Sequence, residues 1–295
     1  MRISVYAAVF LAGVLALGSP WLAARQSPHV AVRLLAGSGI AAAAATWWGL
    51  MLLVGTLLAG EPRVGARTGW TPRTWSALDP VPHIFAVVAA AGLLAVTLRV
   101  AAELRRQITT RRAAADECRH ATSELVVHDC DDVYAYAVPG RDPHIVASSA
   151  MLRLLNTRQR RALLAHERSH LRHRHDLYLF AGRLSAALNP LLTRHRDDIA
   201  YLCERWADED AAEHLGDRTL VAGSLACASV AVLGARGQLG FERLGVRHRL
   251  AALASERPPN RPLTAAVYAA LALIPLLAAS DATVALWRIV EAAQG

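Results

Sequence analysis

The sequence has no lysine, few cysteines and few charges for its length. All 32 of its basic residues are arginines, only 19% of its 295 residues are charged, and its formal net charge is +8. No two of its four cysteines have the C-x-x-C spacing of a zinc ribbon or a redox site, so free thiols are expected. These cysteines are Cys118, Cys130, Cys203 and Cys227.

Apolar residues are what the sequence has in abundance. They make up 54% of the chain, and the mean hydropathy is +0.27, which is too apolar for an ordinary soluble enzyme. Four runs are long enough to cross a bilayer, and the length of the first favours a retained span over a cleaved signal peptide. Three spans are predicted at residues 3–24, 34–59 and 84–104, within an N-terminal region of residues 1–104. A fourth span is predicted within residues 262–295 and is followed by a short tail.

Between the third and fourth spans lies an insert, residues 105–261, that is large enough for its own core. Arginines mark both of its ends, which predicts a cytoplasmic insert and puts both termini and the loop 61–82 outside. The three arginines of that loop weaken the assignment. Because many arginines flank the spans, direct nucleic-acid binding is not expected. The apolar run Leu220–Leu233 is short and follows a charged helix, so it predicts a buried helix and not a fifth span.

The insert begins with patterns typical of short strands. These are Glu124–His128, Val133–Ala137 and His144–Ser148, and the pattern becomes helical from Met151 onward. Thr157 is predicted as the N-cap of the helix that runs into the cluster of His166, His170, His173 and His175. The fold class expected is therefore a mainly α integral membrane protein with an α+β insert.

His166, Glu167 and His170 form an H-E-x-x-H motif on this helix. Two histidines four residues apart project from one helix face, so their imidazoles can bind one metal ion. Glu167 is placed to act as a general base on water. A solvated face rich in histidine and arginine is the alternative that the motif alone leaves open.

A catalytic zinc site needs a third protein ligand, and the sequence offers one on a second helix. Glu204 and Asp208 are four residues apart, so Glu204 can bind the metal while Asp208 accepts the N–H of a ligating histidine. An acidic surface helix remains the alternative. His173, His175 and Asp176 are not expected as ligands: the helix is predicted to continue past His170, with His175 facing elsewhere.

The segments "LLAHERSH", "HDLYL", "LNPLL" and "CERWADEDA" resemble the BlaR/MecR family of integral-membrane zinc metallopeptidases, related to the Ste24 and HtpX type. "VYAYAVPGRDPHIVASSAMLRLL" and "VRHRLAALASERPP" extend the resemblance over nearly the whole chain. It implies a gluzincin-like insert that holds one Zn²⁺, with Glu167 as the catalytic residue and Asp208 as the hydrogen-bond partner of a ligating histidine. The metal ligands implied are His166, His170 and Glu204.

The resemblance also implies a multi-pass protein of the bacterial cell membrane that cleaves a cytoplasmic protein in cell-wall or antibiotic stress signalling. The substrate implied is a transcriptional repressor, for example of the winged-helix type, and a homodimer is left open. The chain stops at Gly295 and contains no S-x-x-K, S-D-N or K-T-G set, so direct β-lactam sensing is not expected. An HtpX-like quality-control protease and a non-catalytic, zinc-stabilised scaffold are the alternatives. Tyr201, His248 and Arg249 are candidates for stabilising an oxyanion.

Overall fold

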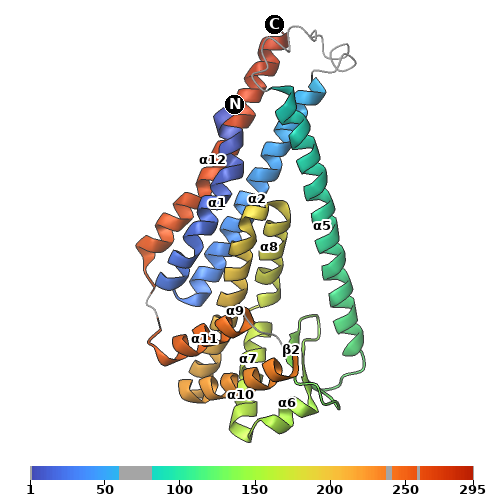
Figure 1. Cartoon of the computed structure of the whole chain (residues 1–295), viewed down its shortest axis with the longest axis vertical. Coiled ribbons are helices and arrows are strands. Elements are labelled where there is room, and N and C mark those ends of the chain that lie inside the picture. The colour runs from blue at the N-terminus through green and yellow to red at the C-terminus, as the bar shows by residue number, and fades with distance from the viewer. Residues whose placement is uncertain (1, 60–81, 237–240, 258–259, 295) are drawn as a thin grey trace.

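The computed structural model describes residues 2–59, 82–236, 241–257 and 260–294. Long helices form the upper region in Figure 1, and shorter helices and a small sheet lie below them. The long helices are α1 (Arg2–Arg25), α2 (Pro28–Ala59), α5 (His83–Glu117) and α12 (Pro262–Gln294). The other helices are α6 (Ser149–Leu154), α7 (Thr157–Arg172), α8 (His175–Leu188), the 3₁₀ turn η1 (Pro190–Leu192), α9 (Thr193–Leu215), α10 (Arg218–Arg236) and α11 (Phe241–Ala254). The mainly helical class with a small sheet is confirmed.

Three of the predicted spans have a counterpart in the described residues. Pro28–Leu58, His83–Glu117 and Pro262–Glu291 are long and apolar enough to cross a membrane. The stretch Phe10–Arg25 of α1 is apolar but shorter, so the first predicted span, residues 3–24, stays a prediction. The loop predicted at 61–82 falls, except for Pro82, outside the described residues.

Helix α5 is longer than the sequence indicated. The predicted span ends at Leu104, but the helix runs on without a break to Glu117. Residues that favour helices, mainly alanine and arginine, continue past the apolar run and offer no glycine or proline to end it. The arginines that were predicted to follow the third span therefore lie on the same continuous helix as that span.

The hairpin formed by α8, η1 and α9 packs among the long helices (Figure 1). At its tip, the Asn189 amide donates to the Thr46 hydroxyl at 3.0 Å, and His195 Nε2 donates to the Leu35 carbonyl at 2.7 Å. Gly39 allows this close approach, because a Cβ at this position would lie 3.1 Å from the His195 ring. The largest buried cluster joins residues of α1, α2, α9 and α12, so this hairpin shares its core with the long helices.

The small sheet has three strands in the order β1-β3-β2. β1 (Leu125–His128) pairs parallel with β3 (His144–Ser148), and β2 (Ala135–Val138) pairs antiparallel with β3. All three strands were predicted, with β2 shifted by two residues at its start. β2 lies at an edge of the sheet and contacts α7, which carries the histidines.

Alanines allow α7 and α9 to approach closely. Ala162 and Ala165 of α7 form one buried cluster with Ala211 and Ala212 of α9, and Val221 of α10 completes it. The run predicted as a buried helix lies in α10, which packs on α7, α9 and α11. All four cysteines are free, as predicted.

Candidate metal centre

The start of α7 fixes the register of the histidine helix. The Asn156 side chain accepts a hydrogen bond from the Gln159 backbone N–H, and the Gln159 side chain accepts one from the Asn156 backbone N–H. This capping box makes Asn156 the N-cap, and the prediction of Thr157 was wrong by one residue. Two turns further, His166 and His170 face the same side, and their Nε2 atoms lie 3.1 Å apart.

Glu204 of α9 meets this pair of imidazoles. Its two carboxylate oxygens lie 3.6 Å from His166 Nε2 and 3.5 Å from His170 Nε2. One donor atom from each of the three residues lies within 4.8 Å of the other two. A tetrahedral zinc ion with bonds of about 2.0–2.1 Å separates its ligand atoms by about 3.3 Å. The distances therefore fit a zinc site with three protein ligands.

The other ring nitrogen of each imidazole also has a partner. His166 Nδ1 lies 3.0 Å from Asp208 Oδ1, and His170 Nδ1 lies 2.9 Å from His175 Nδ1. A partner on Nδ1 fixes the ring orientation and leaves the Nε2 lone pair for a metal. Asp208 was predicted in this position, whereas His175 was expected to face elsewhere, and that expectation was wrong.

A break in the helix brings His175 back to His170. Helix α7 ends at Arg172, and Arg174 adopts a left-handed conformation with φ of 53° before α8 begins. The helix was predicted to continue through this point, because the sequence shows no glycine there. The reversal buries His175 completely against Trp206, with ring centroids 4.8 Å apart. Asp176 lines the cavity beside the imidazole pair and forms an ion pair with Arg111 at 2.7 Å.

Glu167 is buried beside the cluster of His166, His170 and Glu204. Burial raises its pKa to about 6, repulsion from Glu204 adds to this, and the charges of His166 and Arg249 oppose it. Its carboxylate also accepts a hydrogen bond from the backbone N–H of Ala137 in β2. A carboxyl group with a pKa near neutrality can both take up and release a proton, as a general acid–base catalyst must.

Arg249 of α11 contacts both carboxylates of α9 at the site, those of Glu204 and Asp208. Its guanidinium binds both oxygens of Asp208, at 2.7 and 2.8 Å, and one oxygen of Glu204 at 2.8 Å. The sequence offered Arg249 only as one of three possible oxyanion donors, and its pairing with two carboxylates could not be read from the spacing. The other two candidates, Tyr201 and His248, lie against each other, with ring centroids 6.3 Å apart.

The charges around the two imidazoles favour a cation at this place. Burial would lower the pKa of His166, but hydrogen bonds to Asp208 and Glu204 raise it to about 10. For His170 burial prevails and lowers the pKa to about 4. The pKa values of Glu204 and Asp208 fall below their usual range despite burial, because His166 and Arg249 lie close. Both carboxylates are thus ionised, as metal binding requires.

Two cavities adjoin each other at His166, Glu167 and Glu204. One, of about 300 Å³, lies toward Tyr136 and Leu179, and the other, of about 180 Å³, lies toward α10. His166, Glu167, Glu204 and the β2 residue Ala135 line both. The second cavity is mainly apolar, with walls made by Met151, Leu155, Ala162, Leu163, Val221, Leu225 and Ala228. A chain lying along β2 would therefore pass directly over Glu167.

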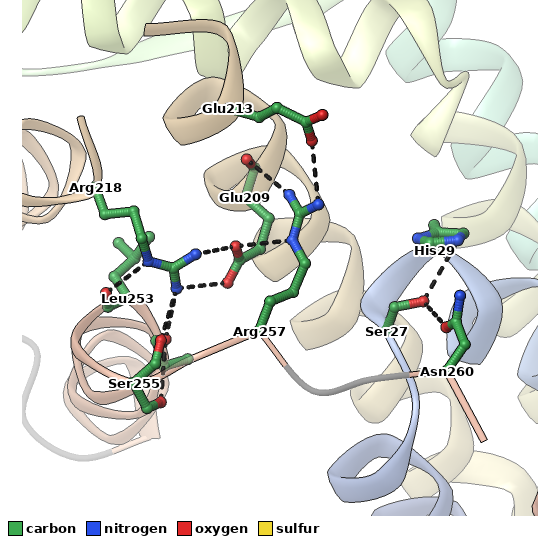
Figure 2. Close-up of polar contacts among 10 residues, drawn as sticks. Ser27, His29, Glu209, Glu213, Arg218, Leu253, Ser255, Arg257 and Asn260 are labelled. Atoms are coloured by element: carbon green, nitrogen blue, oxygen red, sulfur yellow. Dashed lines mark hydrogen bonds and ion pairs between the residues drawn. The ribbon is translucent and has the colours of Figure 1, made fainter. Parts of the chain in front are cut away.

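The position of α9 is fixed below the site by the network in Figure 2. The buried carboxylate of Glu209 binds Arg218 at 2.5 and 3.0 Å, and Arg257 at 3.2 Å. Arg218 also donates to the carbonyls of Leu253 and Ser255 at the end of α11, where a positive charge complements the helix dipole. The network joins α9, which carries Glu204, to α11, which carries Arg249.

The same region is attached to the long helices. Ser27, in the turn between α1 and α2, hydrogen-bonds Asn260, which lies three residues after Arg257 (Figure 2). Beside it, the backbone N–H of Arg261 donates to the side chain of Gln26 at 3.2 Å. The metal centre and the long helices are therefore connected through a short segment of chain.

Comparison with protein families finds that residues 99–195 match peptidase family M48. The match includes His166, Glu167 and His170 and ends before Glu204. Residues 99–195 are well under half of the chain. Comparison with curated proteins and with solved structures gives no match. Family M48 consists of metallopeptidases, and the matched region of this chain supplies two of the three donors in the His-His-Glu cluster. Over this region the chain is similar to a membrane metallopeptidase of the Ste24 and HtpX type.

Proposed function

We propose that this protein is a membrane-embedded, zinc-dependent endopeptidase. The observation that carries the proposal is the convergence of His166, His170 and Glu204 from two helices, with Glu167 adjacent to them. A purely structural zinc site would have no use for a buried carboxyl group at this position.

The residues of the chain have separate tasks in this proposal. A zinc ion held by the three ligands would polarise the scissile carbonyl and make water a better nucleophile. Glu167 takes the proton of the attacking water and passes it to the leaving amine. Asp208 and His175 keep the two imidazoles oriented, and Arg249 holds Glu204 and Asp208 in place.

The substrate is proposed to bind as an extended chain. β2 has a strand partner on one side, β3, and its other side faces α7 and the two cavities. An exposed strand edge offers backbone hydrogen bonds to an extended peptide. The apolar cavity toward α10 then accepts one apolar side chain near the scissile bond.

The finer proposal is a regulatory protease whose active site faces the cytoplasm. The resemblance of "LLAHERSH" and "CERWADEDA" to the BlaR/MecR family supports cleavage of a transcriptional repressor in cell-wall or antibiotic stress. Arginines at both ends of residues 105–261 support the sidedness. The proposed partners are thus the bilayer and a cytoplasmic protein substrate, with a homodimer left open.

A second candidate is a quality-control protease of the HtpX kind, and the match to family M48 favours it specifically. The two differ in how many proteins they cleave. A proteome comparison of a Glu167→Gln strain with wild type separates them. One stabilised DNA-binding repressor supports the regulator, and many accumulating membrane proteins support quality control.

The proposal is tested on the full chain, purified in detergent. Wild type should contain about one zinc per chain and cleave a fluorescent casein, and a chelator should stop the cleavage. Glu167→Gln should keep the zinc and lose at least about 1000-fold in rate, because a general base is removed while the ligands stay. Glu256→Gln, an exposed position, is the matched control. Bound zinc without any cleavage that depends on Glu167 would leave only a zinc-stabilised scaffold.

A further inference from the structure

A further cavity, larger than the two at the metal centre, lies beside them and shares Leu179 with one of them. It has a volume of about 600 Å³ and separates α5 from the hairpin of α8 and α9. None of its lining residues is a metal ligand or takes part in the proposed chemistry. They are Arg99, Ala102, Glu103, Arg106, Leu179, Arg183, Ala186, Ala187, Arg196, Asp197 and Ala200.

Positive charge dominates this crevice. Four of its residues are arginines, contributed by three helices, and two are acidic, which leaves an excess of two positive charges. Glu103 is shared by Arg106 at 3.1 Å and Arg183 at 2.9 Å. Arg99 instead donates to the Ala186 carbonyl at 2.9 Å. A guanidinium has five N–H donors, so each of these arginines keeps donors for a further acceptor.

The crevice lies at the level where a membrane ends. The apolar stretch of α5 begins at His83, and at 1.5 Å per residue Arg99 and Arg106 lie about 24 and about 35 Å along the helix. The hydrocarbon core of a bilayer is about 30 Å thick, so a bilayer that begins at His83 would end between these two arginines. Leu94 and Leu98, just before Arg99 on α5, are 61% and 62% exposed, as side chains that face lipid tails would be.

We propose that this crevice binds the phosphate headgroup of an anionic phospholipid. Phosphate oxygens match the paired donors of guanidinium groups, and basic pockets between membrane helices bind such headgroups. The exposed leucines of α5 provide a path for the acyl chains. A zwitterionic lipid is disfavoured, because its ammonium group would meet the excess of arginine. The bound lipid would fix the hairpin, and with it α9, against α5.

The test uses the full chain in a neutral detergent, with thermal unfolding followed by tryptophan fluorescence. Dioleoyl phosphatidylglycerol is titrated against dioleoyl phosphatidylcholine, glycerol phosphate and inorganic phosphate. We expect phosphatidylglycerol alone to raise the Tm, in a saturable manner. In Arg99→Gln/Arg196→Gln the apparent affinity should fall by about 30-fold, because each arginine is worth about 1 kcal/mol, or about fivefold.

The control is Arg105→Gln/Arg112→Gln, with the same charge change at exposed positions of α5 outside the crevice. It should bind phosphatidylglycerol within about threefold of wild type. An equal loss in this control would show general basic attraction and overturn the site. Equal stabilisation by inorganic phosphate would overturn the lipid as the source of the phosphate, and equal stabilisation by phosphatidylcholine would overturn the charge argument. Zinc content, measured on each variant, reports whether the fold of α7 and α9 is retained.

Discussion

The metal centre and the arginine crevice are built from the same helix with opposite excess charge. Near its start, α9 gives Arg196 and Asp197 to the crevice, and about three turns later it gives Asp208 to the metal centre. In the crevice four arginines outnumber two carboxylates, whereas around the imidazoles Glu167, Glu204 and Asp208 outnumber one arginine. The difference teaches that the balance of charge within each cluster, and not the count of charges, is what supports the ion that we propose for it.

Removing a ligand should have the largest effect on this comparison. Glu204→Gln replaces one anionic donor by a neutral amide of the same size, so we expect the affinity for zinc to fall by more than about 100-fold, beyond the loss typical of a residue behind the ligands. Competition with a calibrated chelator measures this affinity. Glu213→Gln, an exposed position on the same helix, should bind zinc as wild type does. Unchanged zinc binding by Glu204→Gln would remove the third ligand from the proposed site.

Removing the balancing cation should act on stability. Arg249→Met leaves the buried Asp208 without its bidentate partner, and breaking such a pair costs about 3–5 kcal/mol in the free energy of unfolding. Zinc should restore some of this loss, because a divalent cation beside the same carboxylates replaces the missing charge. Thermal unfolding with and without zinc measures both effects. Arg247→Met, an exposed position on α11, is the control, and an equal loss of stability there would contradict this role of Arg249.

The imidazole behind His170 should have a smaller effect. His175→Phe keeps a ring against Trp206 but offers no nitrogen to His170 Nδ1, so we expect about a tenfold loss of zinc affinity. His175→Asn, which keeps an acceptor, should recover some of it, and exposed His214→Phe should change nothing. A full tenfold loss in both His175 variants would mean that packing, and not the hydrogen bond, matters at this position.

The smallest effect is expected from increasing the net positive charge of the crevice. Glu103→Gln removes one of its two negative charges, and at about 7 Å in an environment close to water this is worth about threefold in affinity for an anion. The titration with phosphatidylglycerol should therefore shift to lower concentrations, whereas zinc binding stays the same. A shift in the opposite direction would show that Glu103 holds Arg106 and Arg183 in a geometry that the lipid needs.

The sequence by itself determined the elements and most of the candidate ligands. Hydrophobic runs and 3.6-residue periodicity arise within one segment, which is why the long helices, the strands and the H-E-x-x-H helix could be predicted. The spacing of Glu204 and Asp208 placed them on one helix face for the same reason. The continuation of α5 beyond the predicted span, from residue 105 to Glu117, was not foreseen. Alanine and arginine favour a helix there, although the sequence is no longer apolar enough for a membrane span.

Only the tertiary structure decided which side chains from different elements meet. The left-handed turn at Arg174 has no glycine to announce it, yet it brings His175 to His170. The pairing of Arg249 with Asp208 and the seating of the hairpin tip against Thr46 join residues far apart in the chain. Such contacts depend on how buried faces pack and how charges are balanced once they leave water. No local pattern in the sequence records them.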